Sequence, residues 1–119
     1  MGKNEQQDTG YEVYGKESMV DAIYEEIQAI EDSVELPASV RAVTKKAISK
    51  VLDIEQSLIM GAVAKGDKVR YIGFGTYEKR HRQARNGRNP QDGSPIEIDA
   101  KDVPAFAPGK IFKKEVAGE

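Results

Sequence analysis

The spacing of apolar residues changes abruptly at Lys65-Gly66-Asp67, just past the middle of this 119-residue chain. Before that point apolar residues recur every three or four positions, which is the spacing of amphipathic helices. After it, short β-type stretches are separated by glycine and proline. The change predicts an α+β fold, with helices in the first half and a sheet in the second.

Two helices are predicted in the first half. The first begins at Ser18, where Asp21 completes a variant of the capping box. Pro37 suits the first turn of the second helix, whose apolar stripe continues for about 25 residues and ends before Lys65. Glu55 and Gln56 interrupt that stripe, and this point is interpreted as a rim position. The alternative is a buried functional carboxylate, which is costly without a partner.

Residues 1–17 are polar and aperiodic, and they are predicted to form a flexible N-terminal tail. The alternative is that its apolar side chains dock on the body of the protein. Residues 18–119 are predicted to form one domain. Its helical part covers residues 18–64, and its part with the sheet and the C-terminal helix covers residues 65–119.

A β-ribbon is predicted in the second half. Residues 69–77 form β structure with a glycine-marked bend, and the basic residues that follow extend away from it. Residues 89–93 have turn chemistry, because proline fixes φ and Asp-Gly permits a tight reversal. Ile96 and Ile98 alternate with acidic residues in a returning strand, so the arm covers residues 78–99.

Prolines mark the end of the predicted sheet. Pro104 and Pro108 are expected to end the strand region, because proline cannot donate to a sheet ladder. Residues 110–116 then predict a short C-terminal helix with apolar side chains at Ile111, Phe112 and Val116.

The net charge of −2 and the isoelectric point near 5.5 argue, taken alone, against a nucleic-acid-binding protein. Residues 1–64 hold 6 basic and 12 acidic side chains, a net of −6, whereas residues 65–119 hold 12 and 8, a net of +4. The near-neutral total conceals a basic segment without a single acid in residues 79–90. Its five cations are Lys79, Arg80, Arg82, Arg85 and Arg88.

No apolar pattern covers this basic ribbon, and a two-stranded ribbon is only marginally stable in water. The ordinary explanation for such a segment is a solvated charge run. A narrow finger with this charge also fits between two rows of phosphates, which it neutralises with little bulk. We therefore expect the ribbon to bind nucleic acid.

Composition excludes several kinds of site. The chain has no cysteine and only one histidine, His81, so thiolate and multi-histidine metal sites are excluded. The longest uncharged stretch, Gln56–Ala64, has nine residues, whereas a membrane helix needs roughly 20. We find no secretory signal, no dinucleotide fingerprint around Gly73-Phe74-Gly75 and no nucleophile paired with a base. We expect no enzymatic activity, cofactor, metal, small-molecule substrate or membrane partner, and a cytoplasmic location.

The arm carries the most specific motif of the chain. Arg85-Asn86-Gly87-Arg88-Asn89-Pro90 has the form R-x-G-R-N-P, and it stands between two further blocks, Gly66–Tyr77 and Val103–Lys110. Over residues 65–116 the sequence resembles the bacterial histone-like HU/IHF family. The preceding two-helix pattern also fits the N-terminal half of that family.

The resemblance implies two N-terminal helices, a three-stranded antiparallel sheet with a long β-ribbon arm, and a short C-terminal helix. Proteins of the family form intertwined dimers, so a homodimer is expected here, with a heterodimer as the alternative. Phe74, Tyr77 and Phe106 match aromatic residues of the dimer core, a role that suits side chains which bury large areas.

The resemblance also implies a function, which is the architectural, histone-like binding of double-stranded DNA that contributes to DNA condensation in the nucleoid. Family members place their arms in the minor groove, where the proline at the tip wedges between base pairs and bends the duplex. Pro90 matches that intercalating proline, and binding is expected to be largely independent of sequence. The implied DNA-binding residues are Lys79, Arg80, Arg82, Arg85, Arg88, Asn89, Pro90, Lys110 and Lys113. For Lys79 and Arg80 the alternative is simple exposure at the arm base.

The chain departs from the family pattern in its low overall charge, in Glu97 and Asp99 on the return strand, and in the added residues 1–17. Its second helix is also longer, by about two turns. These differences predict weaker non-specific DNA binding than in a basic relative. Two alternatives stay open: a site-specific, IHF-like DNA bender, and an interaction module that recruits a protein through the acidic helical half.

Two further arm residues have open interpretations. His81 is interpreted as a polar spacer or a neutral phosphate contact, with a pH switch as the alternative. Gly87 is interpreted as a requirement of backbone geometry or of a close approach to DNA.

Overall fold

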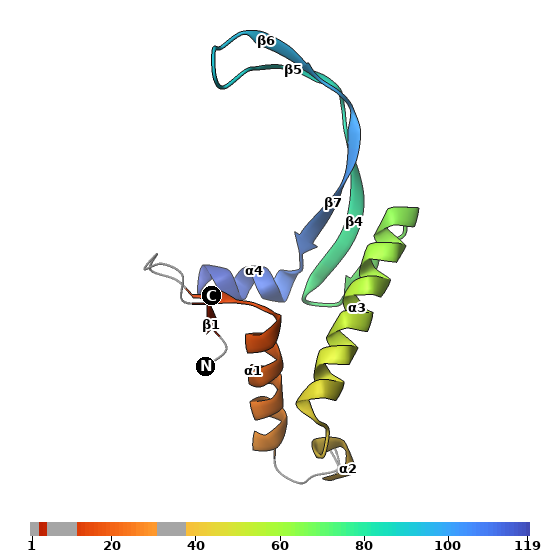
Figure 1. Cartoon of the computed structure of the whole chain (residues 1–119), viewed down its shortest axis with the longest axis vertical. Coiled ribbons are helices and arrows are strands. Elements are labelled where there is room, and N and C mark those ends of the chain that lie inside the picture. Colours follow the sequence, from red (N-terminus) through yellow and green to blue (C-terminus); the bar gives the residue numbers. More distant parts are fainter. Residues whose placement is uncertain (1–2, 5–11, 31–37) are drawn as a thin grey trace. The chain divides into compact units, whose positions relative to one another are not determined.

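The computed structural model describes residues 3–4, 12–30 and 38–119 (Figure 1). The chain divides into two compact units, residues 1–56 and residues 57–119, and helix α3 (Lys45–Lys65) contributes to both. Within the described part of the chain, no helix is both long and apolar enough to cross a bilayer.

The first unit is mostly helical. Val20 and Ile48, each 6% exposed, are its buried apolar side chains among the described residues. Two short strands lie in the segment predicted to be a flexible tail. Residues 1–2 and 5–11 of that segment, including Tyr11, lie outside the described residues. Its elements are the antiparallel strands β1 (Lys3–Asn4) and β2 (Val13–Tyr14), helices α1 (Lys16–Ala29) and α2 (Ala38–Arg41), and the first part of α3.

Helix α1 begins two residues before the predicted position, and the predicted capping box is wrong. Gly15 occupies the N-cap position without a side-chain hydrogen bond. Ser18 is buried within the first turn, and its hydroxyl donates to the carbonyl oxygen of Gly15 at 3.0 Å. Asp21 forms an ion pair with Lys45 at 3.1 Å. The serine hydroxyl therefore satisfies a carbonyl of its own helix instead of a terminal amide.

The predicted long second helix is divided into α2 and α3. Thr44, which the apolar spacing placed inside a continuous helix, caps α3 instead. Its Oγ1 accepts the N–H of Ala47 at 3.1 Å, and its carbonyl accepts the N–H of Ile48 at 3.0 Å. Pro37 lies outside the described residues, and Glu55 is half-buried on α3.

Helix α3 ends where the sequence predicts, within one residue. Gly66 has φ +98°, a left-handed conformation that suits glycine, and its N–H donates to Val63 O at 2.9 Å. The N–H of Asp67 reaches Ala62 O at 3.0 Å. This pair of bonds is the Schellman pattern that satisfies the last carbonyls of a helix.

The second unit holds the predicted sheet, arm and C-terminal helix. The sheet has the order β3-β4-β7, all antiparallel, and the distal arm is a separate pair of strands. This architecture confirms the predicted α+β fold of the chain. The elements are β3 (Val69–Tyr71), β4 (Gly75–Arg82), β5 (Arg85–Arg88), β6 (Pro95–Ile98), β7 (Lys101–Pro108) and α4 (Lys110–Ala117).

The strand region ends at Pro108, as predicted, but the prediction that Pro104 ends it is wrong. Pro104 lies inside β7, opposite Lys79, and the strand continues to Pro108. Among the described residues β7 pairs only with β4 in this sheet, which leaves its other edge without a strand. A proline is tolerated on such an edge strand, where a missing N–H costs no ladder bond.

An aromatic cluster forms the core of the second unit. The ring centroid of Phe106 lies 4.9 Å from that of Tyr77, 5.2 Å from Phe74 and 6.1 Å from Phe112. Gly75 makes this packing possible, because a Cβ at that position would lie 2.3 Å from Cζ of Phe106. The three aromatic residues expected at a dimer core thus pack on one another within one chain, together with Phe112.

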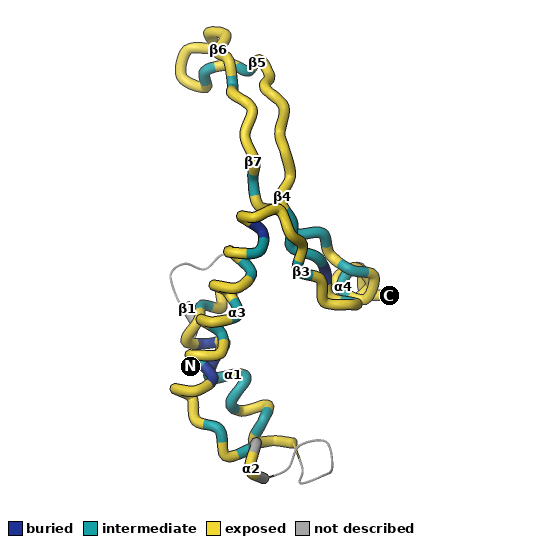
Figure 2. Tube along the Cα trace, turned by 90° about the vertical axis from the view of Figure 1, so that its right-hand side faces the viewer, coloured by how far each residue is buried: buried dark blue, intermediate teal, exposed yellow. Residues whose placement is uncertain are grey.

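Little of the described part of the chain is buried (Figure 2). Val20, Ile48 and Val63 are the only buried apolar side chains in the described part of the chain. Apolar side chains on α3 are largely exposed instead. They are Val51 (62% exposed), Ile54 (52%), Leu58 (68%) and Met60 (66%).

Candidate nucleic-acid interface

The arm is an antiparallel ribbon in two segments that curves along its length (Figure 1). The proximal segment ends at the pair Arg82↔Lys101, and the distal segment begins at Arg85↔Ile98. Two residues on each strand lie between the segments, so the register is the same on both sides of the gap. No residue is inserted, and the interruption is therefore not a β-bulge.

The tip is a turn closed by backbone hydrogen bonds. The N–H of Asn89 donates to Ser94 O at 2.8 Å, and the N–H of Gly93 donates to Asn89 O at 2.7 Å. The side-chain Oδ1 of Asn89 accepts the N–H of Gln91 at 2.9 Å. Pro90 lies between these groups with an exposed ring. The shape of the turn thus depends on Asn89, while the ring of Pro90 is left free at the end of the arm.

Two further side chains hold the tip. Nη1 of Arg88 donates to Gly93 O at 3.0 Å, across the turn. Oδ1 of Asp92 accepts both the N–H of Ser94, at 2.9 Å, and its hydroxyl, at 2.7 Å, and these bonds lower the pKa of Asp92 below 3.8. Arg88 and Asn89, which were predicted to contact DNA, therefore also position the tip.

Carboxylates neutralise the cations at the base of the arm. Arg80 Nε donates to Glu78 Oε2 at 2.8 Å, and Lys68 lies 3.6 Å from the same carboxylate. The hydrogen bond from Arg80 is the main reason that the pKa of Glu78 lies below its usual value.

Asp102 has the same role on the other face of this segment. Its Oδ1 lies 2.9 Å from Nδ1 of His81, and Oδ2 lies 4.0 Å from Lys79 Nζ. The bond to His81, followed by the charge of Lys79, holds the pKa of Asp102 below its usual value. Lys79 and Arg80 are thus engaged at the arm base, in addition to being exposed to solvent.

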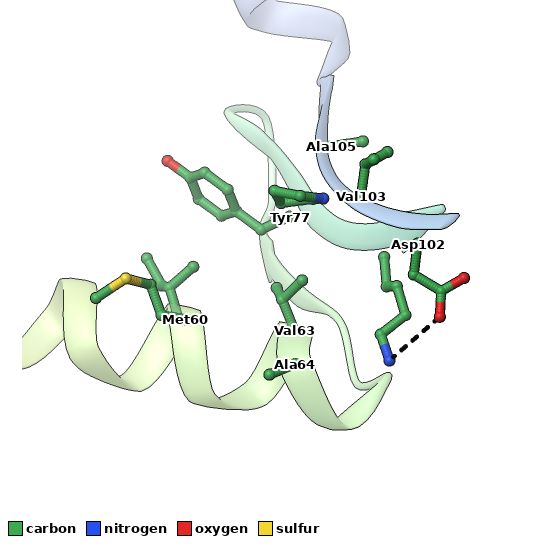
Figure 3. Close-up of a pocket in the computed structure, with 10 residues that line it drawn as sticks. Met60, Val63, Ala64, Tyr77, Asp102, Val103 and Ala105 are labelled. Carbon is green, nitrogen blue, oxygen red and sulfur yellow. Dashed lines mark ion pairs between the residues drawn. The ribbon is translucent and has the colours of Figure 1, made fainter. Parts of the chain in front are cut away.

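Lys79 and Asp102 line an apolar hollow of about 430 Å³ on the face of the sheet toward α3 (Figure 3). Met60 and Val63 of α3 lie across it from Tyr77. Lys79 and Tyr77 share this face because side chains two apart on a strand point the same way. Arg80 and Arg82 are on the other face by the same alternation, so the arm-base cations do not form a single patch.

Three unpaired cations meet at the interruption of the ribbon. Arg82, Arg85 and Lys101 line a hollow of about 610 Å³, together with Asp99. None of the three forms an ion pair with a carboxylate among residues 12–30 and 38–119. Sequence reasoning identified Arg82 and Arg85 but missed Lys101. Counting outward from the turn at residues 89–94 would have placed it opposite Arg82.

The distal arm has an apolar contact that the sequence pattern did not predict. Ile98 lies across Gly87, where an added Cβ would be 2.8 Å from Ile98 Cδ1. Ile96 is directly opposite Gly87 and is 40% exposed. Gly87 therefore leaves room for a side chain of the facing strand, which is a requirement of packing rather than of a left-handed backbone.

Lys110 and Lys113 are exposed on α4, three residues apart and so on the same side of the helix. They do not line the arm hollows. The predicted site residues thus fall into three groups: the arm base, the interruption with the tip beyond it, and α4. No cluster of His, Cys, Asp or Glu suited to a metal ion occurs in the part of the chain that the structure describes.

An exposed ribbon with unpaired arginines, mounted on a small α+β body, is the architecture of an arm-bearing nucleic-acid-binding protein. The profile of the family described as bacterial DNA-binding protein matches residues 14–117. Over 82 residues the chain is 49% identical to DNA-binding protein HU 1 of Bacillus subtilis, covering 69% of this chain and 89% of the relative. It is 46% identical to DNA-binding protein HU of Nostoc over 84 residues, which cover 71% of this chain and 89% of the relative.

Solved structures show the same fold. The HU–DNA cocrystal structure from Anabaena superposes with a TM-score of 0.70 at 40% identity, covering 88% of this chain and 99% of that one. An HU variant from Thermotoga maritima superposes with a TM-score of 0.54 at 25% identity, covering 86% of this chain and 97% of that one. The chain belongs to the HU family of bacterial DNA-binding proteins.

Proposed function

We propose that this protein is a homodimeric architectural protein that bends duplex DNA. Its arms enter the minor groove, Pro90 inserts between base pairs, and binding is largely independent of sequence and contributes to DNA condensation in the nucleoid. The observation that carries the proposal is the free ring of Pro90 on a turn closed by other residues, with unpaired cations behind it. The relative from Anabaena was crystallised with DNA, which supports the same partner here.

The tip suits a wedge. A proline has no N–H to desolvate when its ring enters the base stack. The bonds made by Asn89 and Arg88 preserve the turn while the ring unstacks a base step, which costs a few kcal/mol. Contacts between the arm cations and the phosphates recover that cost as the bent duplex meets more of the protein.

A second copy of the chain accounts for the exposed apolar surface. The four large side chains on α3 are more than half exposed. With three buried apolar side chains, the described part of the chain has too small a core to be stable alone. Sedimentation should give twice the 13.1 kDa of one chain. Leu58→Lys places a charge on this surface and should shift the species toward unfolded monomer. A folded, stable monomer at micromolar concentration would contradict the dimer.

The DNA-binding proposal is tested by titrating a fluorescent duplex at several salt concentrations. The affinity should fall with salt, with a log-log slope of about 0.9 for each phosphate contacted. Competition by a random duplex should match competition by any selected one, whereas a site-specific protein prefers its site by about a thousandfold. Affinity that is indifferent to salt would refute the proposal.

The wedge is tested by Pro90→Ala, with Gln91→Ala as the control at the same exposed turn. Pro90→Ala leaves the hydrogen bonds of the turn in place, because none of them involves Pro90, so binding should persist. Energy transfer between dyes at the two ends of the duplex should show a smaller bend for Pro90→Ala and an unchanged bend for Gln91→Ala. Equal bending by both variants would remove the wedge role from Pro90.

A further inference from the structure

The interruption of the arm follows two like charges that face each other. Arg82 and Lys101 are direct partners across the ribbon, and the ladder stops immediately beyond them. Like charges directly opposite one another destabilise a pair of strands. Since the register is unchanged on resuming at Arg85↔Ile98, no inserted residue explains the gap. Repulsion between the two cations weakens the pairing of the strands at this point.

The other cations of the arm are already satisfied. Lys79 is paired with Asp102, Arg80 with Glu78, and Arg88 donates to a carbonyl of the tip. Arg82, Arg85 and Lys101 converge on one hollow with a single acid, Asp99, in its wall. The hollow therefore carries a net charge of +2, and no second acid lines it among the described residues.

We propose that this hollow is a site for one phosphodiester of the DNA backbone, with Lys101 as its third cation. The proposal rests on the proposed function and adds a residue on the return strand to the DNA interface. The planar guanidinium groups of the two arginines can each donate paired N–H bonds to the oxygens of a tetrahedral phosphate, and the lysine ammonium adds a compact charge. The side chains of Ile98 and Val103 give the hollow an apolar wall.

Phosphate binding at this point would also stiffen the arm. A phosphate between Arg82 and Lys101 cancels the repulsion that interrupts the ladder. The backbone amides of residues 83–84 and 99–100 then have the opportunity to pair, because the two strands are already in register. Contact with the DNA backbone and ordering of the arm are thus one event.

The proposal is tested with Lys101→Gln, and Lys46→Gln, an exposed lysine on α3 in the other unit, is the matched control. Lys101→Gln should lower the salt slope of duplex binding by about 0.9 per protomer. At 0.1 M salt this is a loss of about eightfold in affinity per protomer. Asp99→Asn, which removes the acid from the hollow, should raise the affinity. Lys46→Gln should leave the slope unchanged.

A second readout needs no DNA. Lys101→Gln removes the repulsion from Arg82, so amide hydrogen exchange at residues 83–84 and 99–100 should slow in the free protein, and thermal stability should not fall. In the unaltered protein, a duplex should slow exchange at the same amides. Equal slowing by millimolar inorganic phosphate alone would assign the hollow to free phosphate and overturn the DNA assignment.

The outcomes separate the two proposals. If the unaltered protein shows no salt-dependent binding of duplex DNA, the proposed function itself fails. If it binds with a steep salt slope that Lys101→Gln leaves unchanged, the phosphate site is refuted and the proposed function stands. Unchanged exchange in the free Lys101→Gln variant would overturn the repulsion argument.

Discussion

Gly75→Ala should lower the stability of the sheet, because the added methyl group has no room. Its Cβ would lie 2.3 Å and 2.5 Å from two ring carbons of Phe106, and 2.8 Å from the backbone oxygen of Ala107. The ring cannot simply rotate away, since it packs against Phe74, Tyr77 and Phe112. The oxygen belongs to strand β7, which is paired with β4 at this point.

The expected loss of stability follows from these contacts. Over-packing costs about 1–3 kcal/mol, and each displaced aromatic pair forfeits up to about 1 kcal/mol. Alanine also lowers the conformational entropy of the unfolded chain, which offsets about 0.4–1 kcal/mol of this loss. The free energy of unfolding should therefore fall by about 3 kcal/mol, with a midpoint lower by about 10 °C.

Urea unfolding followed by circular dichroism measures this loss, at a fixed protein concentration because association contributes to stability. Gly66→Ala is the matched control. No atom lies within 4 Å of its added Cβ, but φ is +98°, so it should cost only the left-handed strain of about 1–2 kcal/mol. If Gly75→Ala costs no more than Gly66→Ala, the packing argument is refuted.

Two other changes test single interactions. Thr44→Ala removes the N-cap of α3 and should lower the free energy of unfolding, measured in urea, by about 1 kcal/mol. Thr44→Ser keeps a capping hydroxyl, so it should retain most of that stability. The pKa of Asp102 is below its ordinary 3.8 in the folded protein. The ionised carboxylate therefore stabilises the folded state above pH 3.8, and this stabilisation is lost as the pH falls through the lower pKa of the folded protein. Amide exchange around His81 should therefore accelerate, relative to its intrinsic rate, below about pH 4 in the unaltered protein. The acceleration should be absent in Asp102→Asn, and its persistence there would assign it to another group.

The helices show what periodicity can and cannot predict. Apolar spacing correctly located α1 and the end of α3, because glycine and an apolar stripe act through local backbone preferences. It could not divide α2 from α3, because Thr44 falls on the apolar stripe and its capping role depends on its own backbone conformation. Ser18 was misassigned for the related reason that a hydroxyl serves equally as donor or acceptor.

The arm shows the same limit for a ribbon. Turn residues and the basic run predicted its position, since both are contiguous in sequence. Lys101 and the contact of Ile98 with Gly87 depend on pairing between segments about 10–20 residues apart, which only the register fixes. Proline inside a strand pattern predicts a strand end at Pro104, because sequence alone does not reveal that β7 lies at the edge of its sheet.

The distribution of charge in the structure limits how this protein can attract DNA. A net charge of −2 gives little long-range attraction, and Glu78 and Asp102 further neutralise the arm base. If binding uses only Arg82, Arg85, Arg88 and Lys101 from each of two protomers, the salt slope cannot exceed about 7 in magnitude. Adding Lys110 and Lys113 of α4 would raise the limit to about 11. A measured slope below the smaller figure therefore favours contact through the arms alone, and a larger one requires that the duplex also reach the body of the protein.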